Sequence, residues 1–395
     1  MPGHLMGVYN RAPLAFERGE GARLYGTNGE VYLDCVGGIA TDALGHCNPI
    51  LIKALTEQAS KLWHISNIYQ IPGQEELADK LVANSFADVV FFTNSGTEAV
   101  ECALKTCRKF HSANGAAEDK IDIIGFDGSF HGRTYAAVNA AGNPSYTDGF
   151  GPRLPGYLQC KFGDMEMLES MMGPTTAGII IEPVQGEGGA RAVSDADLRK
   201  MRELCDKHGA LLIYDEVQSG MGRTGKLWAH EWSGVTPDIM AIAKALGGGF
   251  PIGACLATSE AAKGMVVGAH GSTFGGNPLA MAVGIASFNE INSKKILDNV
   301  NEIAGYLNQQ LTGLMDRFPD IIVDVRGRGL LVGVKLVPNN REFMNIACEH
   351  NLLVAGGGDN LVRLLPALNI TIEEAREAIE KFEKACETAR AKAAA

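Results

Sequence analysis

The chain has 395 residues, of which 46% are hydrophobic and 21% charged, enough apolar sequence for one large core and a smaller one. Its 46 acidic residues outnumber its 35 basic residues, and the resulting net charge of −11 argues against a nucleic-acid partner and suits small-molecule chemistry. Residues 1–14 lack the pattern of a signal peptide and no run of 18 uncharged apolar residues occurs, so we expect a cytoplasmic protein without a membrane partner.

The nine cysteines are odd in number and scattered, without a Cys-x-x-Cys pair or a metal-ligand spacing. This pattern is typical of reduced thiols in a cytoplasm and not of a disulfide framework or a zinc site. We therefore predict no metal site.

The N-terminal part is predicted to form a β-hairpin, because Asn28-Gly29 suits a tight turn between segments 22–25 and 31–35. From about residue 89 to residue 255, short apolar runs alternate with helical stretches, as in a parallel sheet covered by helices. The predicted strands are 89–93, 121–126, 177–182, 211–215 and 239–243.

Two helices carry start signals in the sequence. Ser194 and Asp197 form a capping-box pattern before an amphipathic helix that ends at Gly209. Thr371 and Glu374 form a second box, which opens a C-terminal helix.

A first polar cluster, Asn-Ser-Gly-Thr-Glu at 94–98, lies between a predicted strand and the amphipathic helix that follows. Gly96 lets a ligand approach the backbone, and the helix N-terminus offers free N–H groups to a phosphate. The alternative is that Ser95 and Glu98 only cap the helix.

Two further clusters follow buried strands. Asp215 ends one strand, and a buried carboxylate there is costly unless a cation is close by. The alternative to a functional role is a structural ion pair with an arginine. A metal is disfavoured because no ligand array lies nearby. Lys244 ends the next strand among small residues and glycines, where burial would lower its pKa toward nucleophilic use, unless it is simply a surface lysine.

The segment 220–225 fits the Gly-x-Gly-x-x-Gly dinucleotide pattern, but no helix is predicted to open at its glycines. We therefore reject a nicotinamide cofactor. A phosphate site at a helix start, a buried acid and a desolvated lysine together match pyridoxal phosphate: the acid keeps the pyridine nitrogen protonated, and the lysine forms the Schiff base and moves the proton.

At this point the sequence resembles the class III, fold-type-I aminotransferases, and more narrowly the acetylornithine aminotransferase family of arginine biosynthesis. The resemblance runs from about residue 10 to residue 370. The matching motifs are residues 45–46, 66–69, 94–99, 130–134, 182–189, 215–218, 243–249 and 270–278.

The resemblance implies a role for individual residues of the cofactor site. Lys244 and Asp215 are the implied catalytic pair, with Asp215 on the pyridine nitrogen and Lys244 as the Schiff-base lysine. The other implied cofactor contacts are Gly96 and Thr97 at the phosphate, Phe130 on the pyridine face, Val217, Gln218 near the ring hydroxyl, and Thr273, which reaches the phosphate of the other subunit. The family is thus expected to form a homodimer with shared active sites.

For the substrate, the resemblance implies that Arg133 binds the remote carboxylate of an acylated ornithine and that Arg363 binds the α-carboxylate of glutamate. Glu187 is expected to pair with Arg363 until glutamate displaces it, and Ser272 is the fourth implied substrate residue. The alternatives are a core aromatic for Phe130, a turn hydroxyl for Thr273, structural ion pairs for the arginines and a surface carboxylate for Glu187.

The implied fold is α/β: a three-layer large domain with a mixed, mostly parallel sheet, and a smaller α/β domain from both chain ends. We expect residues 1–45 and 286–395 in the small domain and residues 46–285 in the cofactor-binding domain. The implied reaction transfers the δ-amine of N-acetylornithine to 2-oxoglutarate.

Other substrates and other classes of protein stay open at this point. Ile39, where ornithine aminotransferases have tyrosine, disfavours free ornithine. The remaining alternatives are another ω-aminotransferase, acting on succinylornithine, succinyl-diaminopimelate or GABA, a semialdehyde aminomutase and a cofactor-sensing regulator.

Overall fold

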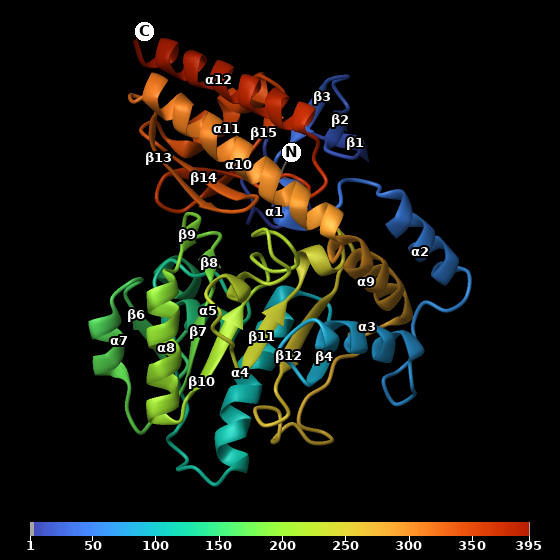
Figure 1. The fold of residues 1–395 in the computed structure, drawn as a ribbon, viewed down its shortest axis with the longest axis vertical. Coiled ribbons are helices and arrows are strands. Elements are labelled where there is room, and N and C mark those ends of the chain that lie inside the picture. The colour runs from blue at the N-terminus through green and yellow to red at the C-terminus, as the bar shows by residue number, and fades with distance from the viewer. Residues whose placement is uncertain (1–3, 395) are drawn as a thin grey trace.

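A computed structural model describes residues 4–394, and its centre is a seven-stranded sheet (Figure 1). The strand order is β4-β12-β11-β10-β7-β5-β6, and every strand is parallel to the others except β12, which runs antiparallel to both neighbours. All five predicted strands are confirmed. The bounds are β4 Val89–Thr93, β5 Asp122–Phe126, β6 Tyr157–Cys160, β7 Thr176–Ile181, β10 Leu211–Asp215, β11 Ile239–Ile242 and β12 Gly253–Ala257.

Helices cover both faces of this sheet, because successive residues of a strand point to opposite sides. Leu211 and Ile213 of β10 pack in one hydrophobic cluster with α4, whereas Leu212 and Tyr214 pack in another with α8. The result is the expected three-layer arrangement. The helices of this part are α4 Gly96–Ala113, α5 Tyr135–Ala141, α6 Pro144–Thr147, α7 Met165–Met171 and α8 Asp195–His208.

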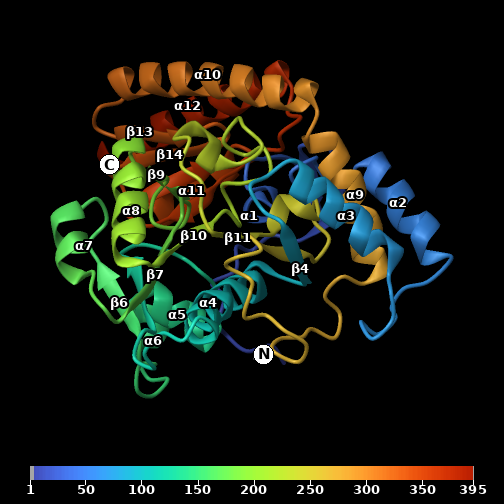
Figure 2. The ribbon, with the colours of Figure 1, turned by 60° about the horizontal axis from the view of Figure 1, so that its bottom comes forward.

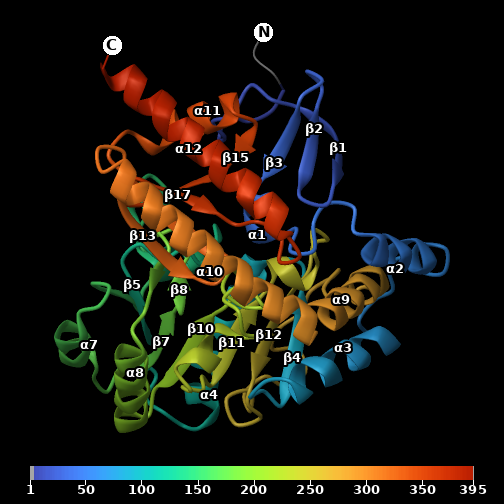
Figure 3. The same ribbon diagram turned by 45° about the horizontal axis from the view of Figure 1, so that its top comes forward.

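The two chain ends build a second unit together. β15 pairs in parallel with β3, so that residues from opposite ends of the chain share one sheet, beside α11 and α12 (Figure 3). The predicted hairpin is confirmed as the antiparallel pair β2 and β3. The strands of this sheet are β1 Phe16–Glu20, β2 Arg23–Gly26, β3 Val31–Asp34 and β15 Leu352–Leu353.

A further four-stranded sheet, of order β13-β14-β17-β16, lies between this unit and the large sheet. α10 packs on β13 and runs alongside α12 (Figure 2). The bounds are β13 Ile322–Arg328, β14 Leu331–Leu336, β16 Ala355–Gly357, β17 Leu361–Leu364, α10 Lys294–Arg317, α11 Asn340–Glu349 and α12 Ile372–Ala394.

Local signals in the sequence explain where two of these helices begin. The Ser194 side chain accepts a hydrogen bond from the N–H of Asp197 at the start of α8. Before α12, Thr371 and Glu374 exchange the hydrogen bonds of a capping box. Both predicted helix starts are confirmed.

The remaining elements connect the two units. α2 and α3 both pack against α9. Within residues 4–394 no helix is long and apolar enough to cross a membrane. These elements are α1 Gly37–Ala40, α2 Pro49–Ala59, α3 Pro72–Ala83, β8 Val184–Gln185, β9 Arg191–Ala192, η1 Ala229–Trp232, η2 Lys244–Leu246 and α9 Pro278–Ile291.

Candidate active site

Asp215 lies buried at the carboxyl end of β10, where its carboxylate has two hydrogen-bond donors. One oxygen is 2.7 Å from Nδ1 of the buried His131, and the other accepts the N–H of Val217 at 3.0 Å. Burial alone lowers the pKa of His131, but the hydrogen bond to Asp215 and the nearby carboxylate charges outweigh burial and raise it. The side chain that contacts the Asp215 carboxylate is therefore a histidine, instead of the arginine considered above.

Lys244 follows β11, the neighbour of β10 in the sheet, and is half-buried. Burial, followed by the charge of Arg363, lowers the pKa of Lys244 to about 8, although Asp215 acts in the opposite direction. Its backbone has a φ of +44°, in the left-handed region that residues other than glycine rarely adopt. Lys244 is thus a partly desolvated amine close to both Asp215 and Arg363.

The N-terminus of α4 forms a tight cradle in which small residues allow close packing. Ser95 caps the helix by accepting the N–H of Glu98, and Gly96 follows as the first helical residue. A Cβ at Gly96 would lie 2.6 Å from Val217 Cγ1. A Cβ at Gly132, where φ is +120°, would lie 2.1 Å from Thr97 Oγ1. The loop after β10 and the loop before α5 therefore both touch the start of α4.

Arg363 is on β17 and reaches the large sheet from the other unit of the molecule. Its side chain is 2% exposed, and Nη2 makes an ion pair of 2.6 Å with Oε2 of Glu187. Its guanidinium also donates to the Gly356 carbonyl and, at 3.4 Å, to Oε1 of Gln218. The pair expected between Glu187 and Arg363 is present, and Gln218 lies in the same group.

Arg133 is exposed and lies against aromatic rings. Its guanidinium carbon lies 3.8 Å from the centroid of the Tyr146 ring and 5.6 Å from that of Phe130. The Tyr146 and Phe130 rings meet edge to face at 5.9 Å. Burial, followed by the charge of Glu187, raises the pKa of Tyr146, which shows that this aromatic group is close to the Arg363–Glu187 pair.

Glu182 is a third buried acid, directly after β7, and the sequence reasoning gave it no role. Its carboxyl accepts the N–H of Phe130 at 3.0 Å and the N–H of Gly186 at 3.4 Å. Burial, followed by repulsion from Asp215, raises the pKa of Glu182 to about 7, although His131 acts in the opposite direction. The available signal was the one used for Asp215, a carboxylate at the end of a buried apolar strand.

Two predicted residues lie in the segment that precedes α9. Ser272 Oγ accepts hydrogen bonds from Asn94 Nδ2 at 3.2 Å and from the N–H of Gly275 at 2.9 Å, which places it near the cradle of α4. Thr273 is exposed, as is the neighbouring Phe274. The structure thus brings Ser272 toward the rest of the site and leaves Thr273 at the surface.

The sequence predicts neither a dinucleotide site nor a metal site. The glycine-rich segment 220–225 forms turns and opens no helix, in agreement with the rejection of a dinucleotide site. Within residues 4–394 no group of three or more His, Cys, Asp or Glu side chains has a metal-binding arrangement.

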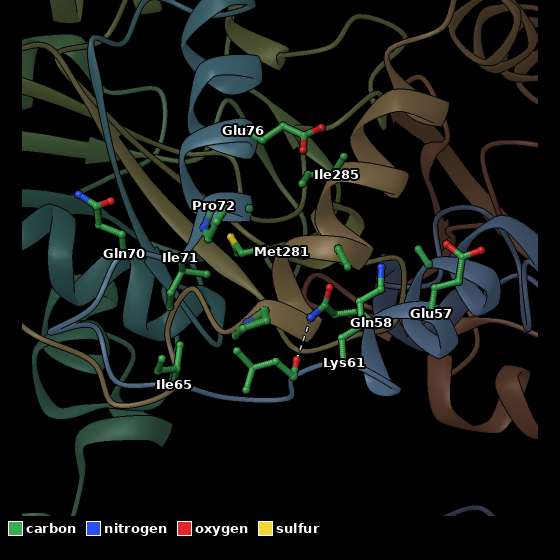
Figure 4. Close-up of a pocket in the computed structure, with 15 residues that line it drawn as sticks. Glu57, Gln58, Lys61, Ile65, Gln70, Ile71, Pro72, Glu76, Met281 and Ile285 are labelled. Atoms are coloured by element: carbon green, nitrogen blue, oxygen red, sulfur yellow. Dashed lines mark hydrogen bonds between the residues drawn. The ribbon is translucent and has the colours of Figure 1, made fainter.

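A pocket of about 500 Å³ lies between α2, α3 and α9, away from these residues (Figure 4). Met281 of α9 lies beside Pro72 and Ile71, Ile285 of α9 lies beside Glu76, and Glu57 is on the side of α2. Its lining includes no residue of the candidate active site.

These groups fit pyridoxal phosphate. The start of α4 offers N–H groups and the close-packed Gly96 to a phosphate, with Gly132 of the loop before α5 packed against it, and Lys244 offers an amine to an aldehyde. Asp215, hydrogen-bonded to His131 and to the N–H of Val217, is an acid of the kind that can face a protonated pyridine nitrogen.

The profile of the aminotransferase class-III family matches residues 7–386. The chain therefore belongs to the class-III aminotransferases, which are pyridoxal-phosphate-dependent transaminases.

Individual relatives narrow the comparison. The chain is 72% identical to acetylornithine aminotransferase 2 of Caulobacter vibrioides, over 99% of this chain and 97% of that protein. It is 38% identical to the solved N-acetylornithine aminotransferase of Stenotrophomonas maltophilia, with a TM-score of 0.86 and coverage of 97% and 98%. It is 31% identical to a Toxoplasma gondii ornithine aminotransferase with pyridoxal phosphate at partial occupancy in the active site, with a TM-score of 0.93 and coverage of 97% and 92%.

Proposed function

We propose that this transaminase transfers the δ-amino group of N-acetylornithine to 2-oxoglutarate and yields N-acetylglutamate semialdehyde and glutamate. The observation that carries the proposal is that one site holds two arginines in different settings. Arg363 is paired with Glu187 and close to Lys244, and Arg133 lies on Tyr146, which is itself close to the Arg363–Glu187 pair. The similarity to acetylornithine aminotransferases supports the same choice of donor.

Pyridoxal phosphate supplies the electron sink for the substrate carbon when it is bound. We propose that Gly96 and Thr97 hold its phosphate, Phe130 and Val217 its ring faces, and Gln218 the ring hydroxyl. In this proposal Asp215 holds the proton of the pyridine nitrogen, and His131 positions the Asp215 carboxyl through their hydrogen bond. Lys244 holds the cofactor covalently and moves the proton at the reacting carbon, for which its pKa of about 8 is suited.

The substrate residues divide between the two amino donors in this proposal. Arg133 binds the remote carboxylate of acetylornithine, and Ser272 is a further substrate-binding residue. Glutamate brings its α-carboxylate to Arg363 and displaces Glu187, whereas acetylornithine leaves that pair closed. The half-exposed Glu187 is free to move in this way, since its side chain is 43% exposed.

We also propose a cytoplasmic homodimer with shared active sites, in which the exposed Thr273 reaches the cofactor phosphate of the partner subunit. Nine free cysteines support the compartment. The pairing of β15 with β3 supports a small domain of residues 1–45 and 286–395 beside a cofactor domain of residues 46–285. Sedimentation of the holoenzyme tests the dimer. Cofactor affinity of the Thr273→Ala variant tests the contact of Thr273 with the phosphate.

A donor panel tests the reaction. The panel contains N-acetylornithine, succinylornithine, free ornithine, GABA and succinyl-diaminopimelate, each with 2-oxoglutarate. We expect the highest kcat/KM for N-acetylornithine, and preference for another donor would contradict the proposal. Turnover without any oxo acid would instead indicate an aminomutase.

Borohydride tests the role of Lys244. Reduction should fix the cofactor on the Lys244 peptide as a stable amine. Modification of a different lysine would contradict the assignment.

A further inference from the structure

Glu182 joins two loops that carry different parts of the site. The loop of residues 127–134 contains Phe130 and Arg133, and the loop of residues 185–191 contains Glu187. The carboxyl of Glu182 accepts one backbone N–H from each loop, from Phe130 at 3.0 Å and from Gly186 at 3.4 Å. One side chain thus receives a donor from each loop.

The same two loops also touch at other positions. Gln185 Nε2 donates to the Asp127 carbonyl at 3.0 Å, and Arg191 Nη2 donates to the same carbonyl at 2.7 Å. A Cβ at Gly188 would lie 2.3 Å from the Gly128 carbonyl, so the two backbones are in close contact there. These contacts help to fix the spacing of the loops, and Glu182 is a buried side chain that ties one backbone N–H of each loop.

We propose that Glu182 is a positioning residue that makes these two loops move as one unit, so that Phe130, Arg133 and Glu187 are positioned together. Both backbone N–H groups depend on the Glu182 carboxyl, because a buried donor without an acceptor is costly. Movement of the Glu187 loop would then be transmitted to the Phe130 loop. The effect of this coupling on the binding of the two amino donors rests on the proposed function, whereas the link between the loops does not.

Amide hydrogen exchange of the holoenzyme, resolved to single residues, tests the tie without any substrate. In Glu182→Ala the amides of Phe130 and Gly186 should both exchange faster, by at least about tenfold, since each loses its hydrogen bond to the carboxyl. A rise at one amide alone, or at neither, would overturn the proposal.

Glu216 gives a matched control for this experiment. It is also a buried carboxylate that accepts two backbone N–H groups, those of Ala229 at 2.6 Å and His230 at 2.9 Å. Glu216→Ala should raise exchange at residues 229–230 and leave Phe130 and Gly186 at their original rates. Faster exchange of Phe130 and Gly186 in this control would mean that the loss of any buried carboxyl speeds their exchange, and it would overturn the specific role of Glu182.

Kinetics of the isosteric variant Glu182→Gln provide a second readout if the alanine variant does not fold. The amide of glutamine has one acceptor oxygen, so one of the two loops loses its bond. KM for acetylornithine and KM for glutamate should then rise together, by about three- to tenfold, with kcat less affected.

The pattern across variants separates the two proposals. A rise in KM for only one donor in Glu182→Gln would overturn the coupling of the loops. If exchange behaves as expected but acetylornithine is not a donor, the proposed function fails and the tie stands.

Discussion

Arg363 and Arg133 place the same chemical group in two different settings within one site. Arg363 is 2% exposed, on a strand, with an ion pair to Glu187 and hydrogen bonds to Gly356. Arg133 is exposed, on a loop, and lies over the ring of Tyr146. The first is fixed by hydrogen bonds of defined direction, and the second by a ring face that tolerates several orientations.

The difference indicates how one site can take two donors. A buried guanidinium is costly without an anion, so Arg363 needs either Glu187 or a substrate carboxylate at every stage. An exposed guanidinium on an aromatic face has no such need and can turn toward a carboxylate at a variable distance. The fixed arginine therefore suits the carboxylate beside the reacting amine, and the adaptable one suits the remote carboxylate.

Removal of the fixed arginine is the most severe way to test the comparison. Arg363→Ala should reduce kcat/KM for glutamate by at least about 10²-fold, because it deletes the charge-assisted bonds to the α-carboxylate. The acetylornithine half-reaction should lose much less. Single-turnover spectra of each half-reaction measure this, and equal losses in both would contradict the assignment.

Removal of the adaptable arginine should have a smaller effect on the other donor. Arg133→Ala should raise KM for acetylornithine by about 10- to 100-fold, the loss expected for one charge-assisted contact remote from the reacting carbon. Cofactor affinity, followed by equilibrium dialysis, should stay unchanged. If acetylornithine kinetics are unaffected, Arg133 does not bind its carboxylate.

Removal of the Glu187 carboxylate should shift the ratio of the rates of the two half-reactions. In Glu187→Ala, Arg363 keeps its contacts to Gly356 and loses its anion, so the glutamate half-reaction should gain relative to the acetylornithine half-reaction by about five- to tenfold. Discrimination against α-amines should weaken. Stopped-flow measurement of both half-reactions gives the ratio, and an unchanged ratio would refute the displacement of Glu187 by glutamate.

The smallest effect is expected at the aromatic support of Arg133. Tyr146→Leu keeps an apolar side chain but removes the ring face, so KM for acetylornithine should rise about two- to fivefold, the size of an exposed cation–π contact. Tyr146→Phe is the matched control and should behave like the unchanged protein. A large effect of the phenylalanine variant would mean that the hydroxyl, and not the ring, is important.

Much of the scaffold could be predicted from local patterns. β4 and β10 have the predicted bounds, and the caps at Ser194 and Thr371 begin the predicted helices, because apolar runs and capping residues act over a few positions. The candidate residues Asp215 and Lys244 could be chosen because each ends a buried strand. Neighbouring parallel strands then bring such residues to one edge of the sheet.

Other features depend on contacts between distant segments and could not be read locally. His131 is 84 residues from Asp215, and no local pattern marks it as the partner of that carboxylate. Tyr146 lies in a helix of four residues without a recognisable motif. Glu182 is different, since its position after an apolar strand was visible, but its two backbone donors come from loops that only the fold brings together.

The backbone of Lys244 has a consequence for the evolution and engineering of this protein. A lysine at a φ of +44° costs roughly 1–2 kcal/mol relative to ordinary helical or extended backbone, and asparagine or glycine would relieve most of that strain. Selection for stability alone would therefore replace this lysine. Libraries screened only for a higher melting temperature should enrich inactive chains changed at this position, so any stabilisation campaign on this enzyme needs a parallel selection for turnover.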